Sequence, residues 1–378
     1  MSKSVWIIAG ESSGDLYGAR LARELCRQAP DLAVRGMGGQ AMREAGVDIL
    51  VDSSALGVVG FVEVFRHLGT FLAVFRGLVR RAIAERPAAV VLIDYPGFNL
   101  RFAKRLHAAG IPVIYYISPQ VWAWGKRRIP HLARVVRKML VIFPFETATY
   151  ARTGLDVEFV GHPLIDILAE KRDPRLRREP ATLVLLPGSR DGEVDTLLPV
   201  MARTASWLST RHPEMQVVLP AASTRIADRC RSVLARVAPK ALPEIRIVTA
   251  ETHLWLQRGT VGLAASGTVT MECAILGLPL VVAYRVNPIT YWLGRLLVRL
   301  PFFTIVNLVT GWRVFEEFLQ GDVAPQVLGP ALEAILPGGT RRADVEDGMA
   351  EAVGKLGERS NTSQRAAAAV LRIVAETP

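Results

Sequence analysis

Runs of apolar, largely β-branched residues alternate with amphipathic segments along almost the whole chain. Such runs, which lack polar alternation, are typical of strands covered on both faces in a parallel sheet. The segments between them have helical periodicity, as in residues 16–28 and 193–210. The expected strands are residues 5–9, 89–94, 112–117 and 139–143 in the first half, and 182–186, 216–219, 245–249, 261–264 and 280–283 in the second. The pattern predicts an α/β protein in which βαβ units occur in two sets.

The domain organisation follows from a change in composition near the middle of the chain. Charged residues and two prolines cluster in residues 168–180, just before the second set of strands. That composition is typical of a linker, and 378 residues are enough for two domains with separate cores. We expect domains over residues 1–168 and 180–340. A helical C-terminal segment, residues 341–378, is expected to pack back on the first domain or on a partner subunit.

Composition narrows the class of protein. Cys26, Cys230 and Cys273 are far apart, so neither a disulfide framework nor a zinc knuckle is expected, and a reducing cytosol fits. The first residues lack the apolar core of a signal peptide, so a cytoplasmic location is expected. The net charge of +11 suits nucleic acid, an anionic membrane surface or phosphorylated substrates, although arginines on helix surfaces also explain it. No nucleic-acid-binding signature accompanies the charge, so we expect no nucleic acid partner.

Two segments are candidates for contact with a membrane. Residues 288–309 form the most apolar window, but Arg295 and Arg299 would each cost a membrane span about 2.5 kcal/mol or more. We therefore expect a surface contact at most. Residues 61–83 predict a helix with an apolar stripe opposite three arginines. A basic amphipathic helix can lie on an anionic bilayer, and it can equally cover a sheet.

In open α/β sheets, ligands bind at the loops that follow the carboxyl ends of the strands. The loop after the first expected strand reads AGESSGD. It has neither the P-loop pattern nor the glycine spacing of a dinucleotide site. Glu11, Ser12 and Asp15 could accept hydrogen bonds from sugar hydroxyls. The alternative is a helix cap, in which Ser12 or Ser13 is the N-cap and Asp15 favours the helix dipole.

Three later strand ends in the first half also carry polar or aromatic residues. Asp94 follows a strongly apolar strand, where desolvation raises the pKa of a carboxyl and suits a general base. A structural cap is the alternative. Trp122 and Trp124 could contact a sugar or an acyl chain, and core packing explains them equally well. His162 lies at the expected turn between domains, where it either contacts a ligand or serves the hinge.

The second half contains two loops that open helices directly after strands. Backbone N–H groups at such helix N-termini suit phosphate groups, and an arginine adds a cationic fork for a diphosphate. The residues concerned are Ser189 and Arg190 in the first loop, and Ser266, Gly267 and Thr268 in the second. Glu272, one turn further, could accept hydrogen bonds from both hydroxyls of a ribose. No Asp-x-Asp pair or metal-ligand spacing occurs in the sequence, so we predict a metal-independent nucleotide diphosphate site without a cofactor.

The motifs together resemble those of the lipid-A-disaccharide synthase family, bacterial glycosyltransferases with two Rossmann-like domains whose parallel sheets face each other across a cleft, the GT-B architecture. The resemblance covers about residues 5–328. It rests on AGESSGD, GFVEV, IDYPGFN, SPQVWAW, GHP, LLPGSR, ASGTVTMECA, AYRVNPIT and VNLVTG. It implies transfer of a sugar from UDP-2,3-diacylglucosamine to the 6-hydroxyl of 2,3-diacylglucosamine 1-phosphate. The products would be the β-1′,6-linked disaccharide 1-phosphate and UDP, with inversion at the anomeric carbon.

The resemblance also implies roles for single residues. Asp94 would be the base, Arg190 would contact the donor phosphate, and Asn307 would line the cleft. The remaining assignments are Ser266, Gly267, Thr268 and Glu272 to the uridine diphosphate, and Glu11 and Asp15 to the acceptor sugar. The chain departs from the family pattern at Gly97, Val306 and Trp312, where an acid, a proline and an arginine are common.

Partners and location are further implications of the resemblance. We expect a peripheral homodimer on the inner face of the inner membrane, with exchange of C-terminal segments between the subunits as one option. Two alternatives are another UDP-N-acetylglucosamine enzyme of the same fold, either a 2-epimerase or a hexosaminyltransferase with a soluble acceptor, and a non-enzymatic membrane- or nucleic-acid-binding protein. Binding of nucleic acid would weaken steeply with salt and would release no UDP.

Overall fold

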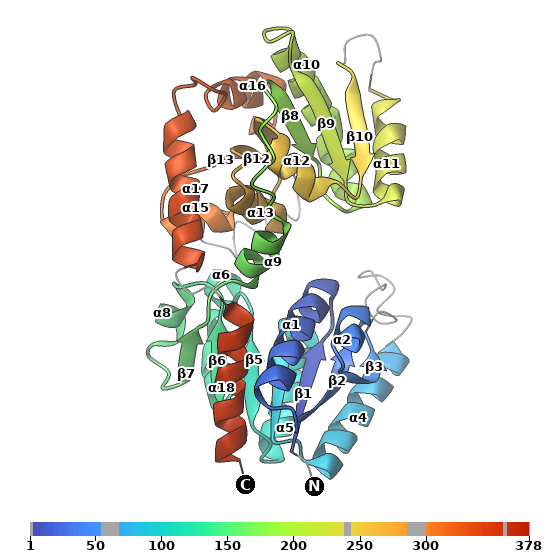
Figure 1. Ribbon diagram of the computed structural model, residues 1–378, viewed down its shortest axis with the longest axis vertical. Helices are drawn as coiled ribbons and strands as arrows, with labels where there is room; N and C mark the ends of the chain where they lie inside the picture. The colour runs from blue at the N-terminus through green and yellow to red at the C-terminus, as the bar shows by residue number, and fades with distance from the viewer. Residues whose placement is uncertain (1–2, 54–67, 238–242, 286–299, 358–360, 378) are drawn as a thin grey trace. The chain divides into compact units, whose positions relative to one another are not determined.

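The computed structural model describes residues 3–53, 68–237, 243–285, 300–357 and 361–377. The chain folds into two compact units (Figure 1). The first comprises Met1–Pro163 and Glu358–Pro378, and the second comprises Leu164–Gly357. The GFVEV motif, residues 61–67 of the expected amphipathic helix, and residues 286–299 with most of the apolar window and of AYRVNPIT lie outside the described residues.

The first unit contains a seven-stranded parallel sheet with strand order β3-β2-β1-β4-β5-β6-β7. Its strands are β1 (Ser4–Ala9), β2 (Ala33–Gly38), β3 (Asp48–Asp52), β4 (Ala89–Ile93), β5 (Val113–Tyr116), β6 (Lys138–Val141) and β7 (Asp156–Phe159). Its described helices are α1 (Ser12–Gln28), α2 (Gln40–Glu44), α4 (Leu68–Glu85), α5 (Pro96–Ala108), α6 (Val121–Trp124), the 3₁₀ helix Lys126–Arg128, α7 (Ile129–Val135), α8 (Glu146–Tyr150) and α18 (Thr362–Glu376).

Both faces of this sheet are covered, which is why its central strands read as continuous apolar runs. Alternate residues of a strand point to opposite faces. Trp6 and Val90 belong to the core beneath α4, α5 and α7. On the other face, α1 packs against β1, and α18 packs against α1 and β4. All side chains of β4 are buried, as the sequence predicts.

The second unit contains a six-stranded parallel sheet with strand order β10-β9-β8-β11-β12-β13. Its strands are β8 (Thr182–Leu186), β9 (Gln216–Ala221), β10 (Ile245–Thr249), β11 (Val261–Ala265), β12 (Leu280–Tyr284) and β13 (Glu316–Leu319). Its described helices are α9 (Pro163–Lys171), α10 (Asp191–Ser209), α11 (Thr224–Leu234), α12 (Thr252–Arg258), α13 (Thr268–Leu276), α15 (Ile305–Thr310), the 3₁₀ helix Gln320–Asp322, α16 (Pro325–Glu333) and α17 (Arg342–Gly357). The two parallel-sheet units give the α/β class that the sequence predicts.

The charged stretch expected to link the domains belongs instead to the second unit, which begins at Leu164. Arg178 donates hydrogen bonds to the carbonyl oxygens of Leu256 at 3.4 Å and Leu276 at 2.9 Å. These carbonyls lie in the last turns of α12 and α13, where helices leave backbone acceptors without partners. The clustered arginines therefore include a structural anchor, and the expected boundary at residues 168–180 is replaced by one at Pro163–Leu164.

The C-terminal segment expected over residues 341–378 is divided between the units. Helix α17 packs against α13 and α15 in the second unit. Helix α18 returns to the first unit, where it packs on α1 and where Arg365 donates to the carbonyl oxygen of Val160 at 2.6 Å (Figure 1). Within this chain, the last helix thus completes the cover of the first sheet.

Candidate active site

The turn after β4 holds Asp94 in a strained backbone conformation. Asp94 and Tyr95 have φ values of 43° and 47°, in the left-handed region that residues other than glycine rarely adopt. The side-chain amide of Asn99 donates to the carbonyl oxygen of Asp94 at 2.7 Å, and the Tyr115 hydroxyl donates to the same oxygen at 2.7 Å. Backbone strain of this kind costs about 1–3 kcal/mol per residue and clusters at functional sites. The strained turn fixes the position of the carboxyl group.

The surroundings of Asp94 make its carboxyl a stronger base than usual. Burial and, to a lesser extent, the negative charge of Glu11 raise its pKa to about 6, while the backbone N–H of Tyr95 opposes both. A base whose pKa lies near the working pH is well matched to proton abstraction. The structure thus gives Asp94 the desolvated position that the sequence predicts.

The opening loop is a neighbour of this turn. A side chain at Gly10 would come within 2.3 Å of the Tyr95 ring, so the loop and the turn are in contact. Helix α1 begins at Ser12 with Glu11 at its N-cap position, and the Glu11 side chain makes no capping hydrogen bond, so the alternative in which Ser12 or Ser13 is the N-cap is wrong. Glu11 and Ser12 are both exposed. They remain candidates for contact with a substrate.

Asp15 has a structural role that the sequence did not indicate. It is 8% exposed, and its carboxylate accepts hydrogen bonds from the backbone N–H groups of Gly39 at 2.6 Å, Ala41 at 2.9 Å and Met42 at 3.2 Å. These groups belong to the first turn of α2. Asp15 therefore caps α2, and its carboxylate is engaged inside the protein rather than offered to a sugar.

Trp122 is held by a buried carboxyl group that the sequence analysis missed. Its indole N–H donates to Glu146 Oε1 at 3.1 Å, and its ring packs edge-on against Phe145 at 5.0 Å. Glu146 is 1% exposed, and burial raises its pKa to about 8. It stands at the first position of a short helix, where an acid ordinarily looks like a surface residue, so no sequence signal marked it. The Trp124 side chain lies outside the described residues.

His162 is buried in the first unit and packs against the Phe143 ring at 5.3 Å. Burial lowers its pKa to about 3, so the imidazole is neutral at physiological pH. These surroundings favour packing over contact with a ligand.

The second unit has a cavity of about 480 Å³ at the carboxyl ends of β8, β9 and β11. It is the place where ligands bind in open α/β sheets. The predicted donor-site residues that line it are Ser189, Arg190, Ser266, Gly267, Thr268 and Glu272. The structure brings together the whole set that the sequence assigns to the nucleotide, although the set comes from loops about 80 residues apart.

The two helix N-termini at this cavity differ in their free hydrogen-bond donors. At α10, Glu193 Oε2 accepts from the backbone N–H groups of Ser189 at 3.1 Å and Arg190 at 3.3 Å. At α13, the N-cap is Gly267, and open space adjoins its Cα. The carboxylate of Glu193 thus occupies the first predicted phosphate cradle from within the chain. The N-terminus of α13 is therefore the more open of the two candidate anion sites.

Asn307 does not line this cavity. It is fully buried, and its side-chain N–H₂ donates to the carbonyl oxygen of Phe315 at 2.9 Å and to Glu317 Oε1 at 2.8 Å. Its Oδ1 accepts from the backbone N–H of Phe315 at 2.9 Å. The amide is used to join α15 to β13, so the expected contact of Asn307 with a ligand has no support in its surroundings.

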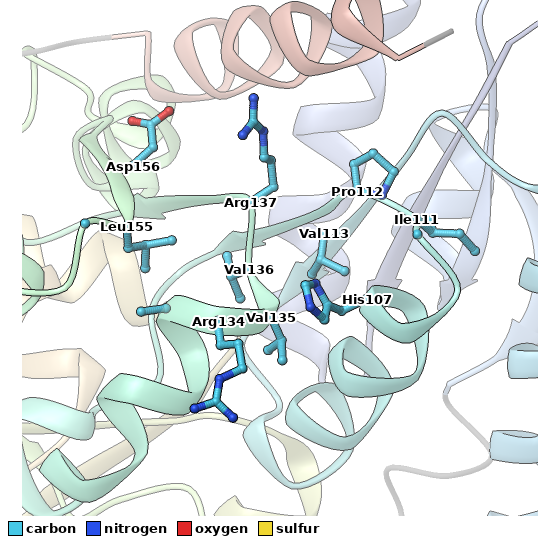
Figure 2. A pocket seen from close by; sticks show the side chains of 13 residues that line it. His107, Ile111, Pro112, Val113, Arg134, Val135, Val136, Arg137, Leu155 and Asp156 are labelled. Carbon is cyan, nitrogen blue, oxygen red and sulfur yellow. The ribbon is translucent and has the colours of Figure 1, made fainter.

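A second cavity, of about 460 Å³, lies in the first unit at the amino ends of β5, β6 and β7 (Figure 2). His107, Arg134, Arg137 and Asp156 are among its lining residues. Figure 2 shows that Arg134 and Arg137 point away from each other. Asp94 lies at the opposite, carboxyl edge of the same sheet, and none of the predicted site residues lines this second cavity. The candidate site is therefore assigned to the carboxyl edges.

Two features are absent from the described part of the chain. No described helix is both long and apolar enough to cross a membrane. No group of three or more His, Cys, Asp or Glu side chains in the described ranges is placed to hold a metal ion.

The fold is similar to that of several solved glycosyltransferases and UDP-GlcNAc 2-epimerases. The glycosyltransferase of kitacinnamycin matches with a TM-score of 0.66 at 17% identity, covering 99% of this chain and 100% of that protein. The UDP-GlcNAc 2-epimerase of Neisseria meningitidis matches with a TM-score of 0.65 at 11% identity, covering 98% of this chain and 100% of that protein. At such identities the likeness shows the fold alone. The chain is a two-domain α/β protein of the GT-B class.

Sequence comparison gives the family. The model described as "Lipid-A-disaccharide synthetase" matches residues 5–371. The lipid-A-disaccharide synthases of Syntrophus aciditrophicus and Coxiella burnetii are 39% and 38% identical, and each alignment covers 99% of this chain and at least 98% of the relative. The chain belongs to the lipid-A-disaccharide synthase family. It is a glycosyltransferase of lipid A biosynthesis that uses a UDP-linked sugar and a lipid-linked acceptor. The alternative of a 2-epimerase or a hexosaminyltransferase with a soluble acceptor is not favoured.

Proposed function

We propose that Asp94 is the general base of an inverting transfer of 2,3-diacylglucosamine from UDP to 2,3-diacylglucosamine 1-phosphate. Asp94 accepts the proton of the acceptor 6-hydroxyl as that oxygen attacks the anomeric carbon of the donor. The bond between this carbon and the diphosphate oxygen breaks, and UDP leaves with the electron pair. One displacement inverts the α-linked donor to a β-1′,6-linked product. The observation that carries the assignment is the strained turn that holds a carboxyl of pKa about 6.

The donor diphosphate binds at the N-terminus of α13, beside Arg190. The first-turn N–H groups of this helix and its dipole favour an anion, and the guanidinium adds a second source of positive charge. The Arg190 side chain is 83% exposed, so it can turn towards a ligand at little cost. Charge that develops on the leaving UDP is stabilised by the same groups. Glu272 accepts hydrogen bonds from the ribose hydroxyls.

The acceptor sugar contacts Glu11 and Ser12, which are exposed beside the Asp94 turn. Asp15 contributes indirectly, because its cap on α2 fixes the loop that carries them. The half-buried Trp122, held by Glu146, is available for contact with the sugar or an acyl chain.

The protein acts at the cytoplasmic face of the inner membrane as a peripheral homodimer. Helix α4 supports this proposal, because it exposes Leu72 and Ile83 and also carries exposed Arg76, Arg80 and Arg81. An anionic bilayer attracts such a surface. Flotation with vesicles that contain phosphatidylglycerol tests the contact, and phosphatidylcholine vesicles are the control. Sedimentation of the detergent-free protein tests the dimer.

The reaction is tested by incubating the purified protein with both acylated substrates and analysing the lipid product by mass spectrometry and NMR. A tetraacyl disaccharide 1-phosphate with a β-1′,6 linkage is expected, together with one UDP for each disaccharide formed. Reactions without the acceptor, and reactions of UDP-GlcNAc alone, control for hydrolysis and for 2-epimerisation. Formation of N-acetylmannosamine, or transfer to soluble acceptors only, would refute the proposal.

A further inference from the structure

Three side chains of the second unit form a hydrogen-bonded chain at the wall of the nucleotide cavity. Lys171 Nζ lies 3.4 Å from His253 Nδ1, and His253 Nε2 lies 3.1 Å from Glu272 Oε2. His253 and Glu272 line the cavity, and they come from α12 and α13. Lys171 comes from the last turn of α9 and is not among the lining residues.

Lys171, at the start of this series of hydrogen bonds, fixes the direction of both of them. A lysine ammonium group can only donate, so His253 Nδ1 must be the acceptor and carries no proton. The neutral imidazole then has its proton on Nε2. That N–H donates to Glu272 Oε2, so the donors run from Lys171 through His253 to Glu272.

As a result, one carboxylate oxygen of Glu272 is held by the hydrogen bond from His253, and the other is available to a ligand. Its side chain is 20% exposed, and within the described residues Oε1 has no hydrogen-bond partner. A glutamate that rotates freely would lose rotamer freedom on binding a ligand, whereas this one is already oriented. An oriented carboxylate next to an anion site favours a neutral group with two adjacent hydroxyls, as in a ribose.

We propose that His253 is a positioning residue for the donor nucleotide, which orients Glu272 so that the cavity selects a ribose over a 2′-deoxyribose. This inference rests on the proposed assignment of the cavity to the UDP-sugar. A site built to accept hydrogen bonds from hydroxyl groups rejects the analogue that lacks one, because a half-buried acceptor is then left without a partner. Loss of His253 removes the orientation and therefore the selectivity.

The test is calorimetric binding of UDP and of 2′-deoxyuridine 5′-diphosphate to the full-length protein. For His253→Ala we expect UDP affinity to fall about 5- to 50-fold, because the carboxylate loses a hydrogen bond and its fixed position. Affinity for the deoxy analogue falls less, so the ratio of the two affinities approaches one. His253→Gln should keep more selectivity, because a glutamine can accept from Lys171 and donate to Glu272.

The chain contains a matched control in the same unit. His212 Nε2 lies 3.2 Å from Glu333 Oε1, and the two side chains are 31% and 29% exposed, but neither lines the cavity. His212→Ala should leave both affinities unchanged. In a Glu272→Gln background, His253→Ala should have no further effect on the ratio, since the carboxylate that it positions is absent.

Two outcomes separate this inference from the function on which it rests. Wild-type protein that fails to bind UDP would contradict the assignment of the cavity. Wild-type protein that binds UDP selectively, while His253→Ala keeps the same ratio, would overturn the role of His253 alone. Melting temperatures are measured alongside, because a purely structural role would lower stability and leave the ratio of affinities unchanged.

Discussion

The guanidinium of Arg190 is paired with the carboxylate of Glu193, 2.9 Å away at the start of α10. The same carboxylate accepts the backbone N–H groups of Ser189 and Arg190. If the donor binds as proposed, its diphosphate competes with Glu193 for the positive groups of this loop. We therefore predict that the internal carboxylate lowers the affinity of the cavity for UDP.

Glu193→Gln should tighten UDP binding about 2- to 5-fold, because the competing charge is removed from an exposed pair of modest strength. Arg190→Ala should weaken it, because the cation is lost. Asp195→Asn is the matched control, since Asp195 lies on the same helix as Glu193 and is paired with Arg229 of α11, but does not line the cavity. Calorimetry at low and high salt measures the UDP affinity of the three variants. Weaker binding by Glu193→Gln would show that the carboxylate supports the site rather than competing for it.

Asp94→Asn should lower kcat/KM about 10²- to 10⁴-fold, because the amide cannot accept a proton from the acceptor hydroxyl. Asparagine tolerates the left-handed backbone at this position, so the turn is expected to persist. In the wild type, kcat/KM should rise with pH and level off above about 6, where the carboxyl is ionised. Initial rates between pH 4.5 and 8 measure the profile, and calorimetry with UDP checks donor binding. A variant with near wild-type rates would exclude Asp94 as the base.

Glu11→Gln should move the acid limb of that profile to lower pH. The negative charge of Glu11 raises the pKa of Asp94, so its removal lets Asp94 ionise at a lower pH. Glu24→Gln on the same helix is the control, because Glu24 is paired with Arg27 and does not affect Asp94. The measurement is the midpoint of the acid limb of kcat/KM. An unchanged midpoint would contradict the electrostatic coupling, whatever happens to the KM of the acceptor.

The sequence predicted the buried strands well, and of the four edge strands of the two described sheets it predicted β10 and missed the other three. Strands β4 and β8 are buried along their whole length, so their apolar runs were visible. Strands β3, β7 and β13 lie at sheet edges and carry acids at exposed or half-exposed positions, which breaks the run. β2 is interrupted by glycines and an arginine. Edge strands have one neighbour only, so solvent replaces the apolar contacts that make a strand recognisable.

The same limit applies to the candidate site. Asp94 could be predicted because the end of an apolar strand marks a fixed place at the carboxyl edge. Glu193 had a signal, since an acid three residues after the N-cap is typical of a capping box. His253 had none: it contacts Glu272 through the packing of α12 against α13, and no local pattern encodes that contact.

Asp15→Asn should lower the stability of the first unit rather than its use of the acceptor. Three backbone N–H groups at the start of α2 donate to the Asp15 carboxylate, and an amide offers one acceptor oxygen without charge. Loss of a charged, largely buried acceptor costs about 1–3 kcal/mol in the free energy of unfolding. Asp31→Asn, at an exposed position, is the control. Thermal unfolding measures the loss, and acceptor KM is measured well below the melting temperature. If KM rose while the melting temperature stayed the same, Asp15 would contact the sugar directly, and the cap on α2 would be incidental.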